Sequence, residues 1–429
     1  MKQLISPKSS NQEATKTHPL FLSKYGYTLL LFALFAPFYS ALPAKAANPE
    51  HVQKLLATKS CRQCDLQGAQ LRGTNLVEAD LTGAQLNGAD LSAADLTRAK
   101  LEGAQMQGVK LVAANLEKAN LKEAQLGANG KLVTDLKDAN LKGADLYAAD
   151  LIGAQLAGAQ LTGAQLDFAQ LTVANLEKAD LTEVNLGGAN LERANLRGAT
   201  INKGKLTGAR LMGAQMHNAQ LDTANLDSAN LTGADLSQAN LNAVEMNSAI
   251  LLQANLQRVV LEAANLQNSN FSGADLTGAI LQGAALNRTN LSGANLSRAN
   301  LTNAKLAIAN LTGANLTGAN LNIAYLQNAN LEGSNLNGVD LRQAQLQSAN
   351  LNNASLVGAN LGNANLMGAI LTGANLTYTN LSTADLKGAN LAGANLSHAN
   401  LDQANFKEAN VAGANLKNAR LQGVIGLNL

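Results

Sequence analysis

The sequence is poor in proline, aromatic residues and net charge. Of its 429 residues only 5 are Pro, none is Trp and 3% are aromatic, while 46% are hydrophobic and the formal net charge is +2. A disordered chain needs few aliphatic residues and a large net charge, and a histone-like nucleic-acid binder needs a strong positive charge. Both classes are therefore excluded. All five prolines lie in the first fifty residues, so the rest of the chain contains none.

The first 46 residues have the pattern of a secretory signal peptide. Four lysines, the last of them Lys24, precede an apolar run at residues 25–41 that is too short to span a bilayer. The sequence Ala44-Lys45-Ala46 then provides a small-residue cleavage site. We expect cleavage between Ala46 and Ala47, with an uncleaved membrane anchor as the alternative. Cleavage would remove five Lys and one Glu, which changes the formal charge from +2 to about −2.

A five-residue period runs through the chain from Leu66 to Leu421. Almost every position whose number ends in 1 or 6 is Leu, with Ala two residues before it and Asn, Asp or Gln one residue before it. A helix would scatter these Leu side chains, because five residues rotate it by about 140°. A continuous strand would send successive Leu side chains to opposite faces. Three extended residues followed by a two-residue corner place Ala and Leu inside and Asn outside.

This pattern, as in Ala314-Asn315-Leu316, resembles the A-[DN]-L-x-x repeat of the pentapeptide repeat family. The resemblance implies an all-β fold, a right-handed quadrilateral β-helix with four repeats in each coil and a short N-terminal helical cap. About 18 coils spaced by about 4.8 Å would make a rod about 85 Å long. The expected regions are a signal peptide at 1–46, the cap at 47–60, the β-helix at 61–425 and a C-terminal tail at 426–429.

The first coil contains both cysteines of the chain. In the five-residue register Cys61 takes a Leu position and Cys64 an Ala position, so both side chains are expected to point inward. They form either a disulfide that closes the first turn or two buried thiols. A redox motif is disfavoured because no βαβ unit surrounds them. This junction resembles that of exported cyanobacterial members of the family, which implies a periplasmic or thylakoid-lumenal protein.

Two irregular segments are candidate interaction bulges. The first comprises Asn129, Gly130 and Lys131, and the second Lys203, Gly204 and Lys205. Lys131 stands at a Leu position, where an unpaired buried ammonium group would be very costly. We therefore expect a local bulge there, with Leu132 or Val133 filling the interior. In the second segment Gly204 replaces the inward Ala. Tolerated irregularity without a function is the alternative interpretation of both segments.

No catalytic, cofactor or metal site is expected. His217 and His398 belong to repeats about nine coils apart, too far apart to share a site. The outward Asp residues alternate with Asn and Gln, which is typical of a solvated face. Exposed aromatic residues are predicted to be single and widely spaced, which argues against a base-stacking platform and a nucleic-acid partner. They are Tyr147, Phe168, Tyr325 and Tyr378.

These patterns favour a non-enzymatic structural or protein-interaction scaffold in an exported compartment, with an unknown protein partner. Contact with a membrane is expected only through an uncleaved signal segment. The apolar C-terminal residues 424–429 either cap the last coil or pair two rods end to end in a homodimer.

Two alternative functions were weighed. The quinolone-resistance members of the family imply a gyrase-binding DNA mimic, but their rods carry a strongly acidic face and this chain is near neutral. A flat face that binds ice or mineral is the other alternative, because Thr312, Thr317 and Thr372 belong to outward columns of polar residues. Both are weaker than the scaffold, since Thr is mixed with other residue types in those columns.

Overall fold

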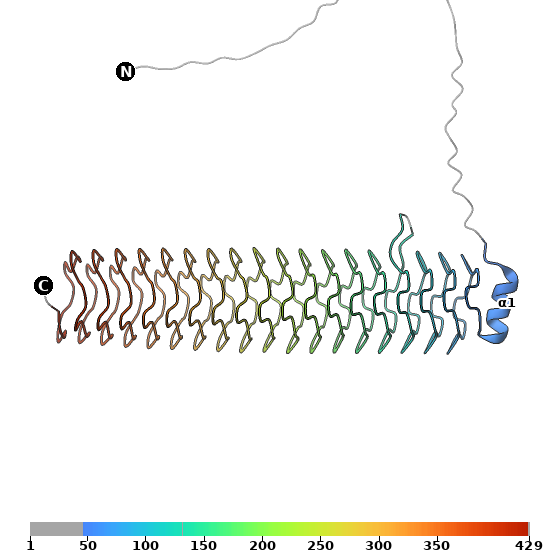
Figure 1. Ribbon diagram of the computed structural model, residues 1–429, viewed down its shortest axis with the longest axis horizontal. Helices are drawn as coiled ribbons and strands as arrows, with labels where there is room; N and C mark the ends of the chain where they lie inside the picture. Colours follow the sequence, from blue (N-terminus) through green and yellow to red (C-terminus); the bar gives the residue numbers. More distant parts are fainter. Residues whose placement is uncertain (1–45, 131, 428–429) are drawn as a thin grey trace, which may run out of the picture. The chain divides into compact units, whose positions relative to one another are not determined.

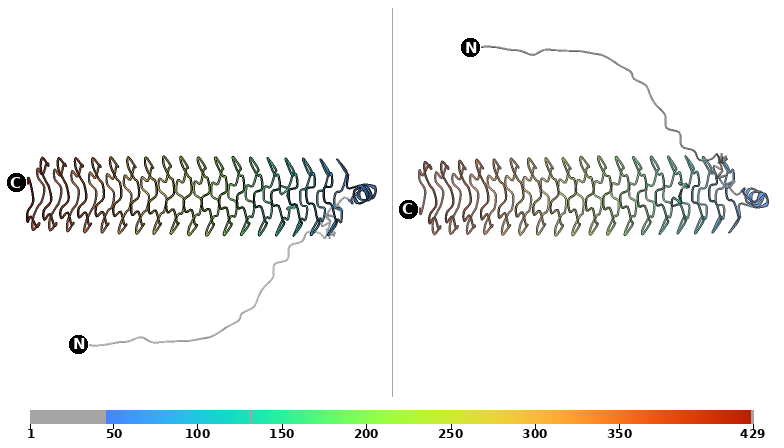
Figure 2. Two further views of the ribbon diagram at one scale, coloured as in Figure 1. Left: turned by 90° about the horizontal axis from the view of Figure 1, so that it is seen from below. Right: turned by 90° about the horizontal axis from the view of Figure 1, so that it is seen from above.

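The described part of the chain is a coil of constant period. The computed structural model describes residues 46–130 and 132–427. Over most of this range every fifth residue forms an isolated parallel bridge with the residue 20 positions later, as Asp235 does with Asn255. Because the sequence period is five, each coil has four sides, as the sequence predicts. Figures 1 and 2 show the coils stacked in chain order.

Each side of a coil contributes a single bridge residue, and no longer strand occurs in residues 46–130 and 132–427. The N–H of Asp235 donates to the carbonyl of Ala214 in the preceding coil at 2.9 Å. The N–H of the next residue, Leu236, donates to Asn255 in the following coil at 2.7 Å. Consecutive residues therefore bond in opposite directions along the stack. Proline would delete one of these donors, which explains its absence from the repeats.

Leu and Ala fill the interior along the whole stack. The Leu positions are buried nearly completely, and so are the larger residues that replace Leu, such as Phe271 and Phe406. The predicted inward placement of Leu and Ala is confirmed. A buried Leu side chain is worth about 1.5–3 kcal/mol. Since each coil contacts only its neighbours, this stabilisation accumulates coil by coil.

The helix α1, Pro49–Thr58, lies within the range expected for the cap and precedes the first coil (Figure 1). The side chain of Asn48 accepts the N–H of Glu50 at 3.0 Å, and Pro49 occupies the first helical turn. The helix ends at Lys59, whose left-handed backbone directs its N–H to Leu55. Leu55 is fully buried among the interior residues. The apolar side of α1 therefore covers the open end of the interior.

The last bridge of the stack joins Asn405 to Ile425. Val411 and Leu416 in this final coil are only partly buried, in contrast to the Leu positions before them. Residues 1–45, which contain most of the expected signal peptide, lie outside the described residues, and so do residues 428–429.

Candidate interaction surface

The outward Asn columns satisfy much of their own hydrogen bonding. The Oδ1 of Asn310 accepts the backbone N–H of Thr312 at 3.2 Å, which closes the corner. The Nδ2 of Asn310 donates to Oδ1 of Asn290 in the preceding coil at 3.2 Å. An amide can accept and donate at once, so Asn suits both tasks. The hydroxyl of Thr312 donates inward to Asn310 at 2.7 Å, so it is already engaged within the column.

Asp residues in the same columns close corners in the same way. Asp90 and Asp95 accept the backbone N–H groups of Ser92 at 2.9 Å and Thr97 at 3.0 Å. Side-chain hydrogen bonds from Ser92 and Thr97 hold the pKa of each carboxyl below its ordinary value of 3.8. A carboxyl with a lowered pKa is a poor general base near neutral pH. These carboxylates therefore act on the backbone conformation.

His217, Ser237 and Asp235 form a polar cluster that the sequence did not suggest. The Oγ of Ser237 lies 2.9 Å from Nδ1 of His217 and donates to Oδ1 of Asp235 at 2.6 Å. Because the serine proton is given to the carboxylate, Nδ1 of His217 must be the donor to Oγ. A nucleophilic triad needs the histidine between the serine and the acid, accepting the serine proton. The arrangement here has the opposite polarity.

The remaining histidine of the repeats, His398, lies about nine coils from His217 at 20 residues per coil. Among residues 46–130 and 132–427, no group of three or more His, Cys, Asp or Glu side chains is placed to hold a metal ion. None of the helical residues in the same range forms a helix long and apolar enough to cross a bilayer.

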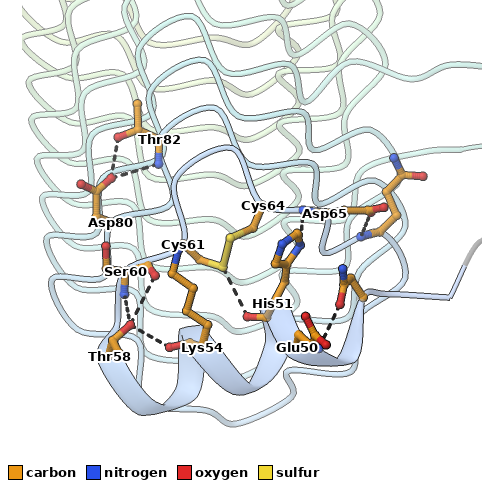
Figure 3. The surroundings of a disulfide bond; sticks show 12 residues. Glu50, His51, Lys54, Thr58, Ser60, Cys61, Cys64, Asp65, Asp80 and Thr82 are labelled. Atoms are coloured by element: carbon orange, nitrogen blue, oxygen red, sulfur yellow. Dashed lines mark hydrogen bonds between the residues drawn. A yellow bond between two sulfur atoms is a disulfide. The ribbon is translucent and has the colours of Figure 1, made fainter.

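Cys61 and Cys64 are joined by a disulfide directly beneath α1 (Figure 3). Their sulfur atoms are 2.09 Å apart, and both side chains are buried. The sulfur of Cys61 lies 3.3 Å from the carbonyl oxygen of His51 in α1. The Nδ1 of His51 accepts the backbone N–H of Asp65 at 3.1 Å. The disulfide and His51 therefore join the helix to the first coil.

The expected cleavage site lies just before α1. Ala46 is exposed, whereas Ala47 is partly buried and packs against the interior residues. The backbone N–H of Asn48 donates to the carbonyl of Asp65 at 3.3 Å. A chain that began at Ala47 would therefore retain the packing and the capping hydrogen bonds of α1.

A five-residue hairpin, residues 129–133, projects from one corner of the stack (Figure 1). Bridge partners are 25 residues apart across it, as Gln125 is from Asp150, instead of 20. Asn129 and Leu132 exchange two backbone hydrogen bonds of 2.9 and 3.0 Å. Gly130 has a φ of 61°, which suits the tight turn between them. Lys131, which the sequence singled out, lies outside the described residues.

The expectation that Leu132 or Val133 fills the interior is wrong. Both side chains are exposed, and the inward position belongs to Thr134, which is fully buried. The Oγ1 of Thr134 donates to the carbonyl of Met106 at 3.1 Å and accepts the N–H of Gly108 at 3.1 Å. Both hydrogen bonds reach the preceding coil and satisfy the buried hydroxyl. The chain thus expels one whole repeat instead of burying irregular residues.

The second irregular segment, Lys203, Gly204 and Lys205, forms no bulge. It has the same corner and bridges as the repeats around it, and Lys205 pairs with residues 185 and 225. A Cβ on Gly204 would lie 2.8 Å from Cγ2 of Ile201. Gly therefore accommodates the branched Ile that replaces Leu in this repeat. Lys203 is exposed and pairs with Glu183 at 3.3 Å.

Exposed apolar side chains gather beside the hairpin on two neighbouring rows of corners. Tyr147 and Phe168 lie on one row, one coil apart, with ring centroids separated by 5.8 Å in an edge-to-face contact. Ile152 and Val173 lie on the next row, five residues further along the same two coils. Together with the exposed residues of the hairpin they form what we call the hairpin patch: Leu132, Val133, Tyr147, Ile152, Phe168 and Val173.

The prediction of single, widely spaced aromatic residues is wrong for Tyr147 and Phe168. It also fails for Tyr378, whose ring stacks on His398 with centroids 4.8 Å apart. In each case the two rings are 20 or 21 residues apart, one coil of 20 residues. The signal was present in the sequence, but only the coil length shows that these positions are neighbours.

The model of a family described as pentapeptide repeats (8 copies) matches most of the coiled region. The matched segments are 64–103, 94–127, 139–177, 174–213, 189–227, 254–293, 294–322, 324–363, 349–388 and 384–423. The interruption after residue 127 contains the hairpin. A comparison with curated proteins found no match.

Several solved structures are similar to parts of the chain. HetL, a pentapeptide repeat protein involved in heterocyst differentiation regulation in the cyanobacterium Nostoc, is 35% identical over 49% of this chain and 89% of its own, with a TM-score of 0.19. A pentapeptide repeat protein from the thylakoid lumen of Arabidopsis thaliana is 32% identical over 25% of this chain and 71% of its own, with a TM-score of 0.15. QnrB1, a plasmid-mediated fluoroquinolone resistance protein, is 19% identical over 52% and 88%, with a TM-score of 0.22.

Proposed function

Because the chain belongs to the pentapeptide repeat family, we propose that it is a non-enzymatic scaffold that presents a protein-binding surface on a stack of coils. The coils then form the right-handed quadrilateral β-helix expected for the family. The reversed polarity of the His217, Ser237 and Asp235 cluster supports the non-enzymatic part of the proposal. So does the use of the Asp columns in closing corners.

The hairpin patch is the observation that carries the proposal. Its six apolar side chains are between 38% and 55% exposed and lie within three adjacent coils. Grouped apolar side chains of this kind mark surfaces that another molecule covers. The hairpin itself is not needed by the stack, because the bridge from Gln125 to Asp150 continues the side without it. A segment that adds exposed apolar surface without adding coil contacts fits a binding role.

We further propose that the protein is exported to a periplasm or a thylakoid lumen. The signal-peptide pattern of residues 1–46 supports this compartment. The disulfide between Cys61 and Cys64 also fits an oxidising compartment, where such bonds persist. Cleavage between Ala46 and Ala47 would leave Asn48, the capping residue of α1, in place.

The proposal is tested by a pull-down from the native host. The full-length gene is expressed with a C-terminal tag, and the cells are fractionated in parallel. We expect a processed chain in the periplasmic or lumenal fraction, together with a protein that is absent from a tag-only control. Full-length chain in the cytoplasm, bound to a topoisomerase, would contradict both the compartment and the scaffold function.

A further inference from the structure

The hairpin patch is a two-by-two array of apolar corners with the hairpin beside it. Tyr147 and Ile152 are consecutive corners of one coil, and Phe168 and Val173 are the same two corners of the next coil. The bridge residue Asp150 lies between the two rows of corners. A shallow hollow adjoins Val173 and is lined by Thr172, Glu192, Arg193 and Met212. The array therefore offers apolar contacts on both sides of a carboxylate.

Carboxylates without a cationic partner border the aromatic pair. Asp167 precedes Phe168 in the same corner, and Glu123 lies on the same row one coil before Tyr147. Within residues 46–130 and 132–427, no Lys, Arg or His side chain pairs with Glu123, Asp150 or Asp167. The patch thus combines ring faces, aliphatic side chains and three unpaired carboxylates.

The nearest cations leave this negative charge in excess. Lys122, in the same corner as Glu123, already pairs with Asp145 at 3.2 Å. Lys131 in the hairpin lies outside the described residues, and its single charge is smaller than that of three carboxylates. A partner that covers the patch must therefore bring positive charge together with apolar groups.

We infer that the hairpin patch binds a protein segment in which Lys or Arg side chains are interspersed with apolar ones. The faces of Tyr147 and Phe168 attract a cation, and Asp150 and Asp167 accept its hydrogen bonds. The apolar side chains of the segment bury Ile152 and its neighbours on the second row. This inference rests on the proposed scaffold function and names the chemistry of its partner.

The chain contains no Trp, so the fluorescence of a Trp-containing probe reports only the probe. The probe is a short synthetic peptide of alternating Leu and Arg with one central Trp, and a second peptide has Glu in place of each Arg. Both are titrated with the purified chain at low and high salt. We expect the Arg peptide to bind with an affinity that falls as salt rises, and the Glu peptide to bind at least about tenfold more weakly.

Matched variants locate the binding site. Tyr147→Ser with Phe168→Ser removes the aromatic pair, and the control is Met367→Ser with Ile308→Ser. Position 308 is on the same row of corners as position 168, seven coils further at 20 residues per coil, and the two side chains are 53% and 55% exposed. We expect the aromatic pair variant to weaken binding of the Arg peptide by about tenfold or more, and the control to change it less than about twofold.

The charge requirement has its own pair of variants. Asp150→Asn with Asp167→Asn keeps acceptors at both positions but removes the charges, and Asp235→Asn with Asp227→Asn is the control at similar positions further along the stack. We expect the first pair to weaken binding by about threefold or more and to flatten its salt dependence. Equal binding of the Glu peptide, or equal effects of patch and control variants, would overturn the inference.

Two further results would also overturn it. One is concentration-dependent self-association that disappears in the aromatic pair variant, which would make a second copy of the chain the occupant. The other is binding to vesicles of phosphatidylglycerol and phosphatidylethanolamine that the same variant abolishes, which would make the occupant a lipid surface.

The inference and the scaffold function fail in different ways. If wild type and the aromatic pair variant retain the same native partner in a pull-down, the scaffold function stands and the patch is wrong. If wild type retains no partner in the native host, the scaffold function fails whatever the peptide result.

Discussion

The side chain of Leu132 lies directly against Gly108 in the preceding coil. A Cβ on Gly108 would be 2.8 Å from Cβ of Leu132 and 3.2 Å from its Cα. The hairpin therefore folds back onto the stack, and a glycine in the neighbouring corner makes the close approach possible. Thr134 then returns the chain to the interior, with its hydroxyl bonded to Met106. The hairpin is an added repeat that is kept outside the coil.

Deletion of residues 129–133 is predicted to leave the fold intact. The remaining sequence Leu126-Gly127-Ala128-Thr134-Asp135-Leu136 is a regular repeat with Thr at the Ala position. Ala128 would adopt the left-handed corner conformation that Ala148 already has at φ 53°. We expect an unchanged circular dichroism spectrum and a melting temperature within a few degrees of wild type, because shortening a loop changes its closure entropy only slightly.

The matched control removes four residues, 129–132, instead of five. This deletion leaves Val133 in the coil and shifts every later Leu by one position relative to the first coils. A one-residue slip turns inward side chains outward. We expect a large loss of stability or of soluble protein for the four-residue deletion. Equal behaviour of the two deletions would contradict the repeat-length interpretation of the hairpin.

Gly204→Ala is predicted to destabilise the coil. The new Cβ would lie 2.8 Å from Cγ2 of Ile201 and 2.9 Å from its carbonyl oxygen. Overpacking of this kind costs about 1–3 kcal/mol in the free energy of unfolding. The further change Ile201→Leu restores the usual Leu-Ala combination, so it should recover most of the loss. Chemical denaturation of the four variants checks this, and strict additivity of the two changes would contradict the proposed contact.

The disulfide between Cys61 and Cys64 is predicted to stabilise α1 and the first coil only. Closing so short a loop is worth about 2 kcal/mol in the chain-entropy model. Replacing both cysteines with Ala should therefore speed hydrogen exchange in α1 by about 30-fold, at 1.4 kcal/mol for each factor of ten. Exchange near Leu396 should not change, because coils contact only their neighbours. Unchanged exchange in α1, or faster exchange throughout the stack, would contradict this prediction.

Stability is predicted to fall in acid. Side-chain hydrogen bonds from Ser92 and Thr97 lower the pKa of Asp90 and Asp95 below 3.8 in the folded chain. Burial raises the pKa of Asp80, but hydrogen bonds from Thr82 outweigh this effect and lower it as well. The unfolded chain then binds more protons near pH 3.8, so the stabilisation is present above that pH and is lost as the pH falls through the folded-state pKa values.

Melting temperatures between pH 7 and pH 2.5 check this prediction. We expect little change down to about pH 5 and a decline below about pH 4. The combined variant Asp80→Asn, Asp90→Asn and Asp95→Asn keeps each corner acceptor but does not titrate, so its decline should be smaller. An acid decline as steep as that of wild type would show that these carboxylates do not carry the effect.

The coil itself could be predicted from the sequence because its signal repeats. The five-residue period of Leu, with Ala and Asn before it, is incompatible with a helix or a long strand, and the family resemblance supplies four repeats per coil. The hairpin could not be placed in the same way. An insertion of five residues leaves Leu136 and all later Leu residues at numbers ending in 1 or 6, so the period does not reveal it.

The hairpin patch was missed for a related reason. Tyr147 and Phe168 are distant in sequence and become neighbours only when residues one coil apart are compared. The interior irregularities depend on pairwise fit as well. Gly204 is explained by the branched side chain of Ile201, and Thr134 by two hydrogen bonds to the preceding coil, and neither contact can be read from the repeat pattern alone.

The account's central claim is that another protein covers the hairpin patch, and photo-crosslinking in the native host tests it most directly. A photoreactive phenylalanine derivative is introduced at position 147, or at position 378 as the control, since Tyr378 is also an exposed corner aromatic, at 62% exposure. The account predicts a covalent adduct with one other protein from position 147 and none from position 378. No protein adduct from position 147 in the exported fraction, or the same adduct from both positions, would contradict it.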